Sequence, residues 1–228
     1  MTITLACLDM AGTTVADDGL VLAAFGAALD EIGVGDAGAR DRMTAYVKAT
    51  MGESKITVFR ALLRSEEIAQ RANLAFEAAY ARLIGTVRPL PGAADTIAAL
   101  RTGGVKVALT TGFSRTTADA LLEHLGWTGA VDLSLCPADA GGRGRPYPDM
   151  ILTAVLRLGI DDVRDVAVVG DTASDIRSGL AAGASVVAGV LTGAHDRERL
   201  VAAGATHVLD RVADIVVHIE GSRQLARS

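Results

Sequence analysis

The sequence predicts an α/β protein in which a parallel sheet carries helices on both faces and an all-helical cap is inserted after the first core strand. Three observations lead to this class. A short apolar run, residues 3–9, ends in an acid followed by Met-Ala-Gly-Thr-Thr. About 65 residues with apolar side chains at helical spacing follow without a strand signal. From residue 93 onward, apolar runs alternate with helical patterns, which is typical of βαβ units.

The first strand and the helical block come before any alternation. Residues 3–9 are apolar up to Asp9, which predicts a fully buried strand. Ala-rich segments between residues 20 and 87 repeat apolar side chains every three or four residues, which predicts helices. Arg-Pro-Leu-Pro-Gly at 88–92 then interrupts the pattern. We therefore assign residues 18–87 to a helical cap, and residues 1–17 with 88–228 to the core.

The remainder of the chain predicts the rest of the core. Helices are expected over 93–104, 114–127, 148–160, 172–184 and 195–205. Strands are expected over 105–111, 130–136, 165–171, 185–191 and 206–209, and residues 212–221 complete the pattern. Because consecutive strands are joined through helices, the sheet is expected to be parallel and the core Rossmann-like.

Composition excludes several classes of protein. Half of the 228 residues are apolar and 21% are charged, which indicates a globular protein with a substantial core. A net charge of −5 argues against a nucleic-acid partner, and no apolar run reaches the roughly 18 residues of a membrane span. The first residues do not resemble a signal peptide. Cys7 and Cys136 lack metal-ligand spacing, so we expect buried thiols and a reducing, cytoplasmic location.

Polar clusters follow the predicted strands, where parallel sheets bind ligands. The clusters are Asp9 with Ala11–Thr14, Thr110–Arg115, Gly142–Pro148 and Gly170–Asp175. Asp9, Asp171 and Asp175 form a hard-oxygen set suited to Mg²⁺. Arg145 can neutralise a phosphoryl group, and Asp9 can attack phosphorus as a nucleophile. Taken singly, Asp175 also fits a helix-surface acid, and Arg145 a surface ion-pair partner.

The order of these clusters resembles the haloacid dehalogenase-like hydrolase superfamily over nearly the whole chain. The matching residues are Asp9 with Gly12 and Thr13, then Thr111, then Arg145, then Asp171 and Asp175. The resemblance implies that Asp9, Thr111 and Arg145 are catalytic. It further implies that Mg²⁺ is held by Asp9, the Ala11 carbonyl, Asp171 and Asp175. The helical block matches the position of that superfamily's cap.

Within this superfamily the chain is most similar to the phosphonatase (phosphonoacetaldehyde hydrolase) subgroup. The shared stretches are Ala-Gly-Thr-Thr at 11–14, Thr-Thr-Gly at 110–112, Gly-Arg-Pro-Tyr-Pro at 144–148, and a cap lysine, Lys55, four residues after Met51. The resemblance implies that Lys55 is catalytic and that the substrate contacts Ala11, Gly12, Thr13, Met51 and Gly112. Two positions depart from the subgroup's pattern: Val58 replaces a histidine and Phe113 replaces a tyrosine.

Ala11 stands where most phosphatases of the superfamily have an aspartic acid that protonates an alkoxide leaving group. A Schiff base at Lys55 would explain the exchange, because an enamine leaving group needs no proton from position 11. The leading hypothesis is therefore an enzyme that cleaves the carbon–phosphorus bond of phosphonoacetaldehyde or a relative. A Mg²⁺-dependent phosphomonoesterase is the alternative, followed by a dehalogenase or a non-catalytic binding protein. The expected partner is a small phosphonate or phosphate, and no nucleic-acid or membrane partner is expected. The sequence also leaves open whether the protein forms a homodimer.

Overall fold

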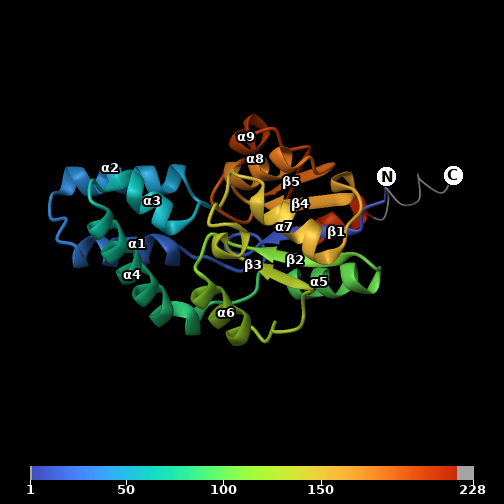
Figure 1. The fold of residues 1–228 in the computed structure, drawn as a ribbon, viewed down its shortest axis with the longest axis horizontal. Helices are drawn as coiled ribbons and strands as arrows, with labels where there is room; N and C mark the ends of the chain where they lie inside the picture. The colour runs from blue at the N-terminus through green and yellow to red at the C-terminus, as the bar shows by residue number, and fades with distance from the viewer. Residues whose placement is uncertain (1, 220–228) are drawn as a thin grey trace.

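The computed structural model describes residues 2–219. A six-stranded sheet and its flanking helices form one part of the molecule, and four helices inserted after the first strand form the other (Figure 1). The inserted helices lie at one end of the molecule, and the sheet with its flanking helices lies at the other (Figure 1). This arrangement confirms the predicted α/β class with a parallel sheet.

The first strand lies in the middle of the sheet. All neighbouring strands are parallel, in the order β3-β2-β1-β4-β5-β6. Their bounds are β1 (Leu5–Asp9), β2 (Lys106–Thr110), β3 (Leu133–Leu135), β4 (Val166–Gly170), β5 (Val186–Val190) and β6 (His207–Leu209). In the register, Asp9 pairs with Thr110, and Leu8 pairs with Val169. The polar residues that follow β1, β2 and β4 therefore meet at one edge.

Helices cover both faces of this sheet, as predicted. Helices α5 (Ala93–Thr102) and α6 (Arg115–His124) share one apolar cluster with Leu8 and Leu109. Helices α7 (Asp149–Leu158), α8 (Ala173–Ala182) and α9 (Arg197–Ala202) cover the other face, on which Cys7 lies. Leu8 and Cys7 face opposite ways because side chains alternate along a strand. Both cysteines are buried and unpaired, as expected.

Short 3₁₀ turns connect several of these elements. They are η1 (Ile84–Thr86), η2 (Pro137–Ala140), η3 (Val163–Asp165) and η4 (Val212–Asp214). The turn η4 begins the last predicted element, whose final residues lie outside the described range. No helix within residues 2–219 combines the length and the hydropathy that crossing a membrane requires.

The inserted helices surround an aromatic cluster. They are α1 (Leu20–Glu31), α2 (Ala37–Ala49), α3 (Lys55–Leu62) and α4 (Glu66–Leu83). Phe25 lies 4.6 Å from Phe59 and 4.9 Å from Phe76, measured between ring centroids. Phe113, which follows β2, extends the cluster, with its ring centroid 4.6 Å from that of Tyr80. The aromatic core thus spans the inserted helices and the sheet domain.

Two of the inserted helices, α2 and α4, begin with a side-chain N-cap. Asp36 accepts a hydrogen bond from the Ala39 backbone N–H (2.6 Å) ahead of α2, and Ser65 accepts one from Ile68 ahead of α4. Such caps satisfy backbone donors that the helix itself leaves unpaired. Glu66 in the first turn of α4 and Arg82 in its last turn also complement the helix dipole.

The chain passes between the two parts twice, through segments that lie side by side. The Ala16 N–H donates to the Arg88 carbonyl (2.9 Å), and the Leu90 N–H donates to the Thr14 carbonyl (2.9 Å). Asp18, on the outgoing segment, has a positive φ of 45°. These two segments include the residues where the cap boundaries are predicted, 17/18 and 87/88, and the boundaries themselves stay a prediction.

Candidate active site

A cavity of about 690 Å³ lies where the carboxyl ends of the strands face the inserted helices. Asp9, Thr111 and Asp171 line it from the sheet side, and Lys55 lines it from the helical side. The walls also include apolar side chains such as Leu22. A cavity of this kind, mostly preformed with a few polar groups, is the common form of a small-molecule site.

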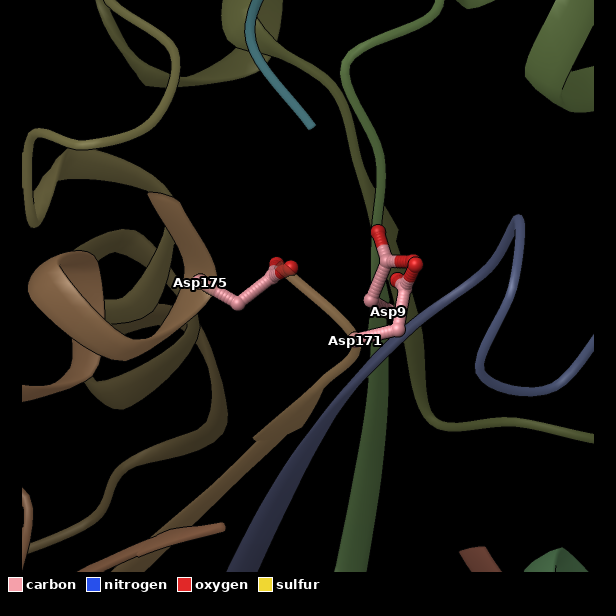
Figure 2. A group of neighbouring side chains, drawn as sticks. All are labelled: Asp9, Asp171 and Asp175. Atoms are coloured by element: carbon pink, nitrogen blue, oxygen red, sulfur yellow. The ribbon is translucent and has the colours of Figure 1, made fainter. Parts of the chain in front are cut away.

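Three buried carboxylates meet at the base of this cavity. Oxygen atoms of Asp9, Asp171 and Asp175 all lie within 4.8 Å of one another. Figure 2 shows that Asp9 and Asp171 lie together at the ends of β1 and β4, while Asp175 reaches toward them from α8. Each of the three residues is at most 5% exposed.

Asp171 is held in place by its immediate surroundings. The Ala194 N–H donates to its Oδ2 atom (2.7 Å), and the Thr13 hydroxyl donates to its Oδ1 atom (3.2 Å). Gly12 has a φ of 89° and leaves no room for a side chain, because a Cβ atom there would lie 2.5 Å from Asp171 Oδ2. Gly12 therefore allows the first loop to approach the carboxylate closely.

Arg145 is the cation that connects this group. Its Nη2 atom lies 2.7 Å from Asp9 Oδ1, and its Nε atom lies 2.6 Å from Asp175 Oδ1. Nη2 also donates to the Thr110 hydroxyl (2.8 Å), and Nη1 donates to the Gly52 carbonyl (3.1 Å). The planar guanidinium can satisfy four partners at once, which the single ammonium of a lysine cannot do with the same geometry.

Asp175 has both of its oxygen atoms engaged. Oδ1 pairs with Arg145, and Oδ2 accepts from the backbone N–H of Thr172 (3.1 Å) and from the Thr172 hydroxyl. Thr172 and Asp175 form a capping box at the start of α8. Asp175 thus holds Arg145 in place, and it also belongs to the three-carboxylate group that could hold a metal ion, so its role as a metal ligand stays a prediction.

The charges in this cluster do not balance. Burial raises the pKa of Asp9 well above its usual value, although Arg145 opposes the shift. Burial, together with the nearby Asp175, raises the pKa of Asp171 to about 7. For Arg145, burial alone would lower the pKa, but the carboxylates of Asp175, Asp9 and Asp171 raise it overall. Three carboxylates face one guanidinium, so a divalent cation would restore neutrality.

Lys55 is the first residue of α3 and is only 7% exposed. Its Nζ atom lies 5.2 Å from the centroid of the Phe113 ring and 3.5 Å from the Glu53 carbonyl oxygen. Burial lowers the pKa of the Lys55 ammonium, while the carboxylates of Asp17 and Asp9 oppose that change. A buried amine with a depressed pKa can act as a nucleophile.

The loop before α3 rests directly on the sheet domain. A Cβ atom at Gly112 would lie 2.5 Å from the Glu53 carbonyl oxygen and 2.8 Å from that of Gly52. Arg199 also donates to the Ala49 carbonyl (2.7 Å). Away from the cavity, Glu77 of α4 accepts hydrogen bonds from Ser114 (2.5 Å) and Thr117. The helices are therefore closed over the carboxylates.

The model of the haloacid dehalogenase-like hydrolase family matches residues 3–183. The chain belongs to this family. Its relatives include phosphonoacetaldehyde hydrolases from Parabacteroides distasonis and Klebsiella pneumoniae. The first is 32% identical over 167 residues (62% of this chain and 62% of the relative), and the second is 35% identical over 158 residues (59% of each). The chain thus spans about three-fifths of the length of these relatives.

Among solved structures, a phosphonoacetaldehyde hydrolase-like protein from Oleispira antarctica has a similar fold. It superposes with a TM-score of 0.83 at 26% identity, covering 100% of this chain and 95% of the other. The expected membership of the haloacid dehalogenase-like hydrolases, and of their phosphonatase-like subgroup, is thereby confirmed. Membership makes this chain a hydrolase, and its three buried carboxylates form a group that could hold a metal ion.

The site residues expected of this haloacid dehalogenase-like hydrolase nearly all line the cavity. Those that line it are Asp9, Ala11, Gly12, Met51, Lys55, Thr111, Gly112, Arg145 and Asp171. Thr13 and Asp175 lie behind it and contact Asp171 and Arg145. The role of each residue stays a prediction.

Sequence reasoning assigned no individual role to three polar residues that the structure places at the site, two of them within the predicted polar clusters. Thr110 bonds Arg145, Thr172 bonds Asp175, and Asp17 lines the cavity beside the first crossing segment. Thr110 had a signal, since it ends β2 directly opposite Asp9, but a threonine at a strand end usually belongs to a turn. For Asp17, the only signal of a site residue in the sequence was the pair of adjacent acids Asp17 and Asp18.

Proposed function

We propose that the protein is a Mg²⁺-dependent hydrolase that cleaves the carbon–phosphorus bond of a small phosphonate aldehyde, phosphonoacetaldehyde or a relative. The observation that carries the proposal is the placement of Lys55. Its buried amine lines the same cavity as the Asp9 carboxylate, and Ala11 supplies no acid there. An amine and a carboxylate with access to one small substrate suit a reaction at adjacent carbon and phosphorus atoms.

The chemistry follows from these two groups. The neutral Lys55 amine attacks the aldehyde carbon, and loss of water leaves an iminium. Asp9 then attacks phosphorus, the electrons of the carbon–phosphorus bond move toward the iminium nitrogen, and an enamine remains bonded to Lys55. Protonation of the enamine carbon and addition of water release the two-carbon aldehyde and restore the Lys55 amine. Water hydrolyses the aspartyl-phosphate and releases inorganic phosphate. Because the enamine separates from phosphorus without needing a proton from position 11, alanine is sufficient there.

Other residues would neutralise and position the phosphonate. Mg²⁺ held by Asp9, Asp171 and the Ala11 carbonyl would offset the charge of the phosphonate oxygens. Arg145 adds positive charge beside Asp9. Thr111 and the backbone N–H groups of Gly12 and Gly112 are suitable donors to phosphonate oxygens. A cytoplasmic location, a homodimer and the absence of a nucleic-acid partner remain part of the proposal.

Borohydride trapping tests the proposal. Incubation of the protein with Mg²⁺, phosphonoacetaldehyde and borohydride should attach the two-carbon skeleton to Lys55, as seen by mass spectrometry of peptides. Lys55→Arg should show no adduct and no phosphate release, because a guanidinium stays protonated. Lys48→Arg is the matched control, since Lys48 lines the same cavity but is exposed. Phosphate release from phosphate esters by Lys55→Arg, without any adduct in the wild type, would favour the phosphomonoesterase instead.

A further inference from the structure

The Schiff-base chemistry proposed above needs a group that moves protons at Lys55. The amine must lose a proton before it attacks, and the carbinolamine hydroxyl must gain one before it leaves as water. Val58, one helical turn beyond Lys55, is an aliphatic side chain that is only 3% exposed. It can neither donate nor accept a proton, so the group must come from elsewhere in the cavity.

Five charged side chains influence Lys55 electrostatically: Asp17, Asp9, Arg145, Glu77 and Glu53. Asp9 is the nucleophile and must stay ionised, and Arg145 does not give up its proton. Glu77 and Glu53 do not line the cavity, and Glu77 already accepts hydrogen bonds from Ser114 and Thr117. Two other acids line the cavity, but Asp171 is assigned to the metal and Asp18 is exposed, so Asp17 is the remaining acid.

Asp17 lies on the crossing segment between β1 and α1, and its side chain is half-buried in the cavity wall. The Val21 N–H donates to its Oδ1 atom (3.1 Å), which fixes the carboxylate at the start of α1. Burial raises the pKa of Asp17, partly offset by the Val21 N–H and by Lys55. Its negative charge is also the strongest electrostatic support for the Lys55 ammonium.

We infer, on the basis of the proposed function, that Asp17 is the general acid–base that forms the Lys55 Schiff base, because the two side chains line one closed cavity. Asp17 first takes a proton from the Lys55 ammonium, leaving a neutral amine and a carboxylic acid. The amine nitrogen bonds the carbonyl carbon, and one N–H proton passes to the carbonyl oxygen. Asp17 then returns its proton to that hydroxyl, the C–O bond breaks, and water and a protonated imine remain.

These steps balance without an outside reagent. The ammonium brings three protons, of which one stays on the imine nitrogen and two leave in the water molecule. Asp17 begins and ends as a carboxylate. Because Lys55 belongs to α3 and Asp17 to the crossing segment, the two groups face the same cavity only while the inserted helices cover the sheet edge.

Single-turnover trapping of Asp17→Asn tests the inference. An asparagine has the same shape and can still accept from Val21, so α1 should form normally. The rate at which the borohydride-trapped adduct of phosphonoacetaldehyde appears on Lys55 should fall by about 10²–10⁴-fold, the usual contribution of general acid–base catalysis. Asp18→Asn is the matched control: it removes one charge at the next residue, which is exposed, and should keep the wild-type rate.

The pH profile separates proton transfer from simple electrostatics. If Asp17 only stabilises the Lys55 ammonium, removing its charge lowers the Lys55 pKa. The curve of rate against pH then shifts to lower pH, and its plateau stays unchanged. That result, or any plateau within about threefold of wild type, would overturn the inference. Asp17→Glu, which restores the acid, should regain more than a tenth of the wild-type plateau. Failure of Asp17→Glu to do so in a folded protein would count against proton transfer. No adduct in the wild type would refute the proposed function itself.

Discussion

The substitution Gly112→Ala tests whether the protein catalyses its reaction in the closed arrangement, with the inserted helices over the carboxylates. The added Cβ atom would lie 2.5 Å from the Glu53 carbonyl oxygen and 2.8 Å from that of Gly52. Ordinary contact begins near 3.4 Å, so the loop before α3 must retreat by about 0.9 Å. That shift moves the Gly52 carbonyl away from Arg145, which donates to it at 3.1 Å.

The expected cost follows from this displacement. A misplacement of about 1 Å can reduce catalysis roughly 10²-fold, so kcat/KM for phosphate release from phosphonoacetaldehyde should fall by about that factor. Alanine keeps the backbone N–H of residue 112, and no positive φ forbids the side chain. The loss of kcat/KM therefore measures the importance of the contact between Gly112 and the loop before α3. Thermal unfolding should change little, because the overlap lies between the two parts and not inside either apolar core.

Gly26→Ala is the matched control. Gly26 lies inside α1, and a Cβ atom there meets nothing within 4 Å. The exchange should leave kcat/KM unchanged and raise the free energy of unfolding by about 0.5–1 kcal/mol, because alanine favours helix. Wild-type kcat/KM in Gly112→Ala would show that the loop does not rest on the sheet domain during turnover, and the closed geometry would then not be the catalytic one.

Four further outcomes are expected. Asp9→Asn should abolish phosphate release while substrate still protects the protein in thermal shift assays; retention of a tenth of the rate would exclude Asp9 as nucleophile. Excess EDTA should stop turnover and Mg²⁺ should restore it, whereas full activity in EDTA would favour a dehalogenase. Asp175→Asn should reduce the rate about 10²-fold by misplacing Arg145, while calorimetry still detects Mg²⁺ binding; lost binding would identify a ligand. Turnover should rise with pH through the depressed pKa of Lys55, and a flat profile would contradict a neutral-amine nucleophile.

The fold could be predicted because its signals are local. Apolar runs of strand length and helical periodicity placed the strands and helices within a few residues of where they lie, and their alternation fixed a parallel sheet. The insertion could be predicted because a block of about 65 residues with helical spacing separates the run ending at Asp9 from the next strand signal. The strand ends then located Asp9, Thr111 and Asp171, since the carboxyl ends of parallel strands share one edge.

The partners of each charged side chain could not be predicted, because they depend on long-range geometry. Arg145 bonds residues far from it in the sequence, namely Asp9, Gly52 and Asp175, and nothing in Gly-Arg-Pro-Tyr-Pro specifies them. The spacing that predicts Asp175 as a metal ligand gives no indication that its two oxygen atoms also contact Arg145 and the capping box.

By itself, the sequence determined the class of the protein, the order of its elements, and the residues gathered at the strand ends, because chain neighbours and periodicity decide these features. Tertiary structure alone decided which groups share the cavity. The lysine at the start of α3 and the acid before α1 line one cavity because the two crossings of the chain pair beside Thr14 and Ala16, and the loop before α3 fits against Gly112. Burial then sets the pKa directions of Lys55 and Asp17, since desolvation depends on what covers a group and not on its neighbours in the chain.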